Sequence, residues 1–233
     1  MMPSHPRILA MSSFRGIVQA AACTFALLAP TLAQAFPDYE VSEARLLPTF
    51  CKYTQDYRER VPGGKNPDEI ERWTRLMGPT FNNMHHYCYG LMEVNRAAFS
   101  SKTNLERVHN LSNSIIEFDY VLRGAPADFY MLPEILTRKG ESLVGLDRGR
   151  EGILEFQRAI GIDASYAPAY AAMSDYYKRA GQPAKAKEWL EKGLSVSPNS
   201  RPLLRRMAEL DGSKSKRAAP GASRKPAGSP PPE

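Results

Sequence analysis

Signals for β-strands are nearly missing from this sequence. No stretch keeps up an alternation of polar and apolar residues, and β-branched residues rarely cluster. Apolar residues instead recur at helical spacing along most of the chain. We therefore expect an all-α protein, and folds built around a β-sheet are excluded.

The short motifs that mark common catalytic and cofactor sites are also missing. The sequence has no glycine-rich phosphate-binding loop, no Gly-x-Ser-x-Gly elbow, no His-Glu-x-x-His and no Cys-x-x-Cys-His haem attachment site. Paired acids such as Asp68 and Glu69 lie at expected helix starts, where a negative charge favours the positive end of the helix dipole. We predict a protein that is not an enzyme and that binds no cofactor.

An excess of basic residues is confined to the two ends of the chain. The formal net charge is +6, yet residues 36–211 hold equal numbers of basic and acidic side chains. The excess lies in residues 1–35 and 212–233. The predicted folded body is therefore neutral, and its charge does not indicate a surface for nucleic acid.

Residues 1–35 are predicted to be a signal peptide. Two arginines precede an apolar run at 17–33, and residues 33–35 read Ala-Gln-Ala, the small-x-small pattern of a cleavage site. Cleavage there would start the mature protein near Phe36 and place it outside the cytoplasm, most simply in a periplasm. Two alternatives stay open, a retained membrane anchor and a lipoprotein. The run is barely long enough for an anchor, and it continues past Cys23, which disfavours lipidation.

Two cysteines, Cys51 and Cys88, follow the predicted signal peptide. A disulfide is the first expectation for an even pair in an oxidising compartment. A second interpretation stays open, because Cys88 lies in a run at 84–89 with His85 and His86. These residue types bind copper or zinc, and His85 and Cys88 would share a helix face. That alternative describes a periplasmic metal- or redox-handling protein, although the sequence indicates no further ligands.

Helices are expected from residue 42 onward. A helix at 42–60 would carry one apolar stripe at spacings of four, three and four, formed by Leu46, Phe50, Tyr53 and Tyr57. Asn66 is the expected N-cap of a second helix, with proline in its first turn, and this helix should end at Gly78 before a proline. Two further helices are expected at 80–99 and 104–123.

An internal repeat with a period of 34 residues covers units 133–166 and 167–200. Positions one period apart match in side-chain size: Leu136 and Tyr170, Gly140 and Ser174, Leu143 and Tyr177, Gly152 and Ala186, Phe156 and Leu190, and Ala159 and Gly193. One more period leads to Leu204 and Ala208, in the last apolar segment. The small residues would let two helices cross closely, and the large residues would fill the space between neighbouring units, which cannot bury their apolar faces alone.

These positions resemble the tetratricopeptide repeat family in period and residue type. The second unit carries the pattern through Tyr170, Met173-Ser174, Tyr177, Ala186, Leu190, Gly193 and Pro198, whereas Lys139 and Ala164 of the first unit depart from it. A degenerate unit at 83–126 and a cap helix at 201–211 would complete the stack. The resemblance implies an α-solenoid of about three helix-turn-helix units, preceded by an N-terminal helical subdomain at 36–82.

The resemblance also implies a binding groove. In this family the first helices of successive units line a concave groove that holds a peptide or a partner helix. The positions that match are Glu134, Thr137, Arg138, Glu141, Asp175, Lys178, Arg179 and Arg205. Their mixed charge favours a polar partner segment. The expected function is that of a protein-binding adaptor or assembly factor in the cell envelope.

Residues 212–233 are predicted to form a disordered basic tail, because they contain no large apolar side chain to bury. Such a tail either only increases solubility or makes weak contact with a polyanion or an anionic membrane surface. It has no aromatic residue to stack on bases, so we expect no specific nucleic-acid binding.

Overall fold

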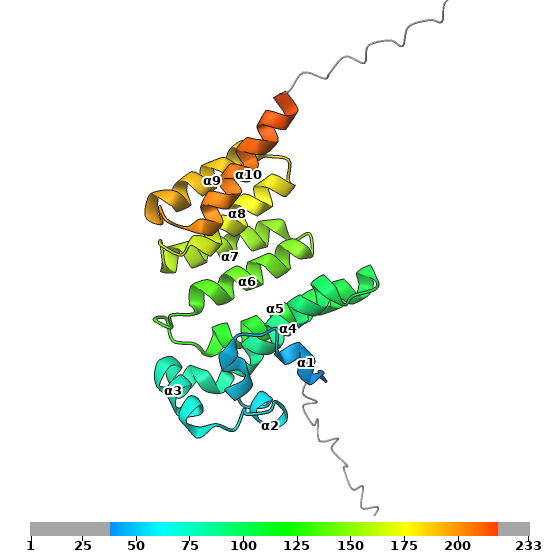
Figure 1. Cartoon of the computed structure of the whole chain (residues 1–233), viewed down its shortest axis with the longest axis vertical. Coiled ribbons are helices and arrows are strands. Elements are labelled where there is room, and N and C mark those ends of the chain that lie inside the picture. Colours follow the sequence, from blue (N-terminus) through cyan, green and yellow to red (C-terminus); the bar gives the residue numbers. More distant parts are fainter. Residues whose placement is uncertain (1–37, 219–233) are drawn as a thin grey trace, which may run out of the picture. The chain divides into compact units, whose positions relative to one another are not determined.

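The computed structural model describes residues 38–218, and every regular element in that range is a helix (Figure 1). Most of the range forms three antiparallel pairs and a final helix: α4 (Met84–Phe99) with α5 (Asn104–Gly124), α6 (Leu132–Gly145) with α7 (Gly149–Ile162), α8 (Ala167–Arg179) with α9 (Pro183–Val196), and α10 (Arg201–Ala218). Each pair packs on the next one in sequence order. The predicted all-α solenoid is confirmed.

Close crossings of the paired helices depend on small residues. A Cβ atom added at Gly140 would overlap the ring of Phe156, and one added at Gly152 would lie 2.7 Å from the Gly140 carbonyl oxygen. In the next pair Ser174 and Ala186 are buried. In α4, a Cβ atom at Gly90 would lie 2.5 Å from the Phe118 ring on α5. The degenerate pair therefore uses the same kind of contact as the regular ones.

The predicted helix at 42–60 is wrong, because three short segments replace it. These are α1 (Val41–Ala44), the 3-10 helix η1 (Thr49–Tyr53) and α2 (Tyr57–Arg60). Pro48 stands in extended geometry before η1, and Thr54 is extended after it, which interrupts the helical hydrogen bonds. Leu46 is consequently 68% exposed, while the other members of the proposed stripe are buried.

The helix capped by Asn66 is confirmed as α3 (Pro67–Met77), with the Asn66 side chain accepting bonds from two backbone N–H groups. Gly78 ends it with a φ of 59°, a conformation that glycine adopts readily. The next helix starts later than the predicted residue 80, since residues 78–83 form the 3-10 helix η2 (Gly78–Asn83). The helix expected at 104–123 is confirmed as α5.

A cluster of buried aromatic side chains fixes the N-terminal segments against α4. The Phe50 and Tyr87 rings stack with centroids 6.0 Å apart, and Tyr57 lies 5.1 Å from Tyr89. Beside them a disulfide joins Cys51 of η1 to Cys88 of α4. Short segments with few helical hydrogen bonds are thus anchored by packing and by one covalent bond.

The last helix differs from the expected cap in two ways. It continues to Ala218, beyond residue 211, so the predicted start of the disordered tail at 212 is wrong. It buries Leu203 fully and leaves Leu204 47% exposed. Leu204 corresponds to Tyr170 one period earlier. Tyr170 packs against α9, the second helix of its own pair. No second helix follows α10 among the described residues, so Leu204 has nothing to cover it.

The predicted signal peptide and residues 219–233 of the tail lie outside the described residues. Within residues 38–218, none of the helices combines the length and the apolar character needed to cross a membrane.

Candidate functional site

The first helices of the pairs bear the residues predicted to face a groove, and Glu134 on α6 connects three of these elements. Its carboxylate accepts a hydrogen bond from Tyr87 Oη on α4 at 2.9 Å and another from Tyr166 Oη, directly before α8, at 3.1 Å. Burial, and after it the nearby charge of Glu134, raises the pKa of both tyrosines, so their hydroxyls stay protonated donors. Glu134 therefore fixes neighbouring repeats to one another.

Arg138 continues this polar row along α6. Its guanidinium lies 3.4 Å from Glu134 and 3.2 Å from Glu141. Burial raises the pKa of Glu141, with the charge of Arg138 opposing that effect. The Glu141 side chain is still 44% exposed, so one face of this carboxyl remains open to a ligand.

A second connection joins α8 to α10. Arg206 binds both carboxylate oxygens of Asp175, at distances from 2.7 to 3.0 Å. Lys178 lies 3.5 Å from Glu209 in a more exposed pair. The bond to Asp175 raises the pKa of Arg206. The two-pronged Arg206–Asp175 geometry is strong and directional, and it aligns the last helix with the repeat before it.

Three of the predicted groove residues, Glu141, Asp175 and Arg179, line one pocket between α6 and α8. Its volume is about 680 Å³. Arg179 is exposed and forms no ion pair with any described residue. The pocket therefore offers a carboxyl group and a guanidinium that are available to a partner.

Sequence reasoning missed two polar residues of this pocket, Asp147 and Tyr176. Asp147 lies in the turn after α6 with a φ of 60°. Tyr176 crosses over Gly149, where a Cβ atom would lie 2.5 Å from the tyrosine ring. Gly149 could have indicated this contact from the sequence, because a glycine at the start of a helix often marks a close approach by another group. The apolar wall comes from Val144, Phe156 and Ala172.

Thr137 and Arg205 are among the predicted groove residues that do not line this pocket. Thr137 is buried, and its hydroxyl donates to the Pro133 carbonyl at 2.8 Å. Arg205 is 72% exposed and lies 3.8 Å from Glu209 on its own helix, away from the pocket. The two residues occupy the same repeat position, two periods apart.

The histidine and cysteine run is divided among separate contacts. Cys88 is in the disulfide, His85 donates from Nδ1 to the Asn82 carbonyl at 3.0 Å, and His86 Nδ1 lies 2.6 Å from Glu117. Burial, followed by the neighbouring His86, lowers the pKa of His85 to about 4. Residues 38–218 contain no group of three or more His, Cys, Asp or Glu side chains arranged to share a metal ion.

Comparison with known proteins identifies one repeat directly. Residues 167–210, which comprise α8, α9 and most of α10, match the family model of the tetratricopeptide repeat. Among solved structures, the chain is similar to the first tetratricopeptide-repeat domain of Spaghetti (RPAP3) bound to the HSP90 peptide SRMEEVD. The two are 13% identical with a TM-score of 0.39, and the match covers 55% of this chain and 97% of that one. None of the curated proteins matches the chain.

Proposed function

This is a tetratricopeptide-repeat protein, and we propose that the face formed by α6, α8 and α10 binds an extended segment of another protein. The observation that carries the proposal is the pocket of about 680 Å³ between α6 and α8. A groove with a few convergent polar groups and an apolar wall is the usual form of a binding site. The segment would be polar, since Glu141, Asp147 and Arg179 offer charges of both signs.

The hydrogen bonds around the groove support a rigid binding surface. Glu134 and Asp175 each join one first helix to the next, so the helices that would hold a ligand are already aligned. Little ordering would then be needed on binding, which improves affinity for a given contact area. The charges that remain available lie at the pocket rather than at these connections.

The test uses a peptide selected from a random-peptide library on the full chain, with its affinity measured by fluorescence anisotropy. Arg179→Glu should weaken binding by about tenfold or more, the effect of losing one charge-assisted contact. Arg150→Glu is the matched control, because Arg150 is an exposed arginine on the second helix α7. Equal affinities of the two variants, both folded by circular dichroism, would contradict the proposal.

The proposed setting is the cell envelope, where the protein would serve as an adaptor or assembly factor. The supporting features are the predicted signal peptide and the Cys51–Cys88 disulfide, a bond typical of oxidising compartments. Intact-mass measurement of the exported protein tests this. We expect a chain that starts at or near Phe36, and a mass that still includes residues 1–35 would contradict it.

The basic residues at the C-terminal end are proposed to add weak binding to anionic surfaces. They are Lys214, Lys216, Arg217, Arg224 and Lys225. Replacing all five with glutamine should abolish cosedimentation with anionic lipid vesicles at low salt and leave the helical signal unchanged. Such binding should weaken steeply as salt rises, since screening acts over about 10 Å at 0.1 M. Binding that ignores both changes would rule out this role.

A further inference from the structure

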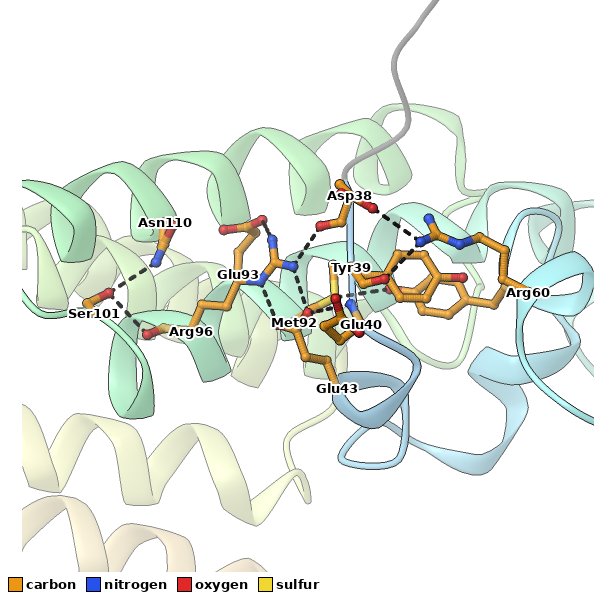
Figure 2. A network of polar contacts seen from close by, with 11 residues as sticks. Asp38, Tyr39, Glu40, Glu43, Arg60, Met92, Glu93, Arg96, Ser101 and Asn110 are labelled. Carbon is orange, nitrogen blue, oxygen red and sulfur yellow. Dashed lines mark hydrogen bonds and ion pairs between the residues drawn. The ribbon is translucent and has the colours of Figure 1, made fainter.

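The two ends of the helical stack differ in how they are covered. At the first end, the segment before α4 folds back over it: Arg96 of α4 binds the two Glu43 oxygens through Nε and Nη2, at 2.6 and 2.8 Å, and Nη2 also donates to the Asp38 carbonyl at 2.8 Å. Figure 2 shows this guanidinium enclosed between Glu43, Glu93 and the backbone of Asp38. At the other end, α10 is the last described element (Figure 1). One face of α10 is therefore open.

The open face of α10 is the face that a second helix covers in the regular pairs. Tyr170 and Ser174 of α8 are only 6% and 1% exposed in the packing with α9. One period later, Leu204 is 47% exposed and Ala208 is also exposed. Leu203, on the opposite side of α10, is fully buried against the repeat before it. The helix thus has the binding face of a first helix, and the described residues contain no second helix for it.

Gly212 continues this face by one more turn. It lies four residues after Ala208, which itself lies four residues after Leu204, so the three share one side of the helix. A Cβ atom at Gly212 would meet nothing within 4 Å, so no contact among the described residues requires a glycine. Glycine destabilises a helix relative to alanine. A helix from another molecule could approach closely here.

The charges along the open face favour a second copy of α10 in antiparallel orientation. Arg201 begins the helix, is exposed and forms no ion pair with any described residue. Asp211, 54% exposed, has only a long contact of 3.6 Å with Lys187. Arg201 and Asp211 have the same midpoint in the sequence as Leu204 and Ala208, at residue 206. An antiparallel copy that places Leu204 on Ala208 therefore also places Arg201 beside Asp211.

The remaining sequence of the chain is a poor source of the missing helix. Residues 219–233 contain several prolines and no large apolar side chain, a composition that does not favour an amphipathic helix. The second helices of the regular pairs are antiparallel to the first ones. A copy of α10 in antiparallel orientation would occupy the equivalent place.

We propose that two copies of this chain associate through α10, each helix lying where the second helix of the other would lie. Leu204 of each copy covers Ala208 of the other, and Arg201 of each pairs with Asp211 of the other. The two-fold axis makes every contact occur twice. Because the interface is small, the dimer is weak and depends on concentration. It uses a different side of α10 from the groove and does not depend on what the groove binds.

Sedimentation velocity over concentrations from about 1 µM to 1 mM, the range of weak interfaces, tests the proposal. The native protein should pass from monomer to dimer in this range. Arg201→Asp and Asp211→Arg should each weaken association by about tenfold or more, because each brings like charges together twice. An equimolar mixture of the two variants should associate as the native protein does, since a copy of one variant then meets opposite charges on a copy of the other.

Two matched controls lie on α7. Arg150→Asp reverses an exposed arginine there and should leave association unchanged. Leu204→Ser should abolish the dimer, whereas Leu154→Ser, which removes a leucine that is 59% exposed, should not. All the replaced side chains are at least partly exposed, and circular dichroism checks that each variant is folded. A native protein that stays monomeric, a dimer that tolerates both charge reversals, or a mixture that associates no better than its components would each overturn the proposal.

Discussion

The Lys139 ammonium on α6 lies 2.7 Å from the Glu155 carboxylate on α7. It also lies 2.8 Å from Asp119 on α5, so one lysine joins the second helices of two consecutive pairs. Burial alone would lower the pKa of Lys139, but the bonds to Asp119 and Glu155 outweigh it and raise the pKa. One period later the same position holds Met173, which is fully buried. Lys139, which departs from the repeat pattern, therefore forms an ionic connection between neighbouring units.

Lys139→Ala should destabilise the protein by about 3 kcal/mol, because it leaves the buried Glu155 without its main partner. This loss of stability is at the low end for removing one partner of a buried ion pair, because Arg158 still lies 2.6 Å from Glu155. Chemical denaturation at neutral pH measures the change. Lys187→Ala is the control. Lys187 forms surface ion pairs at 3.6 and 3.9 Å, so its replacement should lower the free energy of unfolding by at most about 1 kcal/mol.

The pH dependence of that difference follows from the raised pKa of Lys139. A lysine whose folded pKa lies above its unfolded value of 10.5 stabilises the fold fully below that pH. The stability gap between the native chain and Lys139→Ala should therefore be constant near neutrality and close as the pH rises past 10.5. A gap that closes on acidification alone would mean that the lysine is not the group responsible.

Overpacking the helix crossings tests the repeat register. Gly140→Leu and Ser174→Leu should each cost roughly 1–3 kcal/mol or more, because neither site has room for a larger side chain. Lys187→Leu, on the surface of α9, should change the melting temperature little. Equal and small effects in all three variants would show that the small residues do not lie at the crossings.

Much of the fold was predictable because its signals are local and periodic. The size pattern that repeats every 34 residues places Leu136, Phe156 and Leu190 in the core, and all three are buried. The cap of Asn66 and the stop at Gly78 depend only on neighbouring residues, and both are confirmed. Such features need no knowledge of distant parts of the chain.

The errors lie where distant packing decides the structure. Residues 42–60 have a helical apolar pattern, but Pro48 and the aromatic cluster on α4 break the segment into short pieces. The predicted groove residues also depend on which side chains bind one another across helices, and local sequence does not show this. Arg206 rather than Arg205 meets Asp175, and that choice follows from how α10 is rotated against α8.

The Cys51–Cys88 disulfide should contribute on the order of 3–4 kcal/mol by closing a loop with a sequence separation of 37. We expect no free thiol in the native protein and a marked fall in melting temperature on reduction. Cys51→Ala and Cys88→Ala should be equally destabilising, and the double variant no worse than either. Two reactive thiols in denatured, unreduced protein from its native compartment would contradict this and would revive the metal-binding alternative.

Protonation of His85 should make the protein lose stability as the pH falls from 6.5 to about 4. The pKa of His85 is lowered from 6.5 to about 4, chiefly by burial and then by His86, so in this window the unfolded chain binds a proton that the folded chain does not. His85→Asn keeps a side-chain donor near the Asn82 carbonyl and removes the titration. Its stability should therefore fall less between these two pH values than that of the native chain, as measured by chemical denaturation. His109→Asn serves as the control. It changes an exposed histidine of α5 whose Nε2 lies 3.0 Å from Asn113, and it should follow the native curve. Parallel curves for all three proteins would show that His85 is not the buried neutral group that the contacts describe.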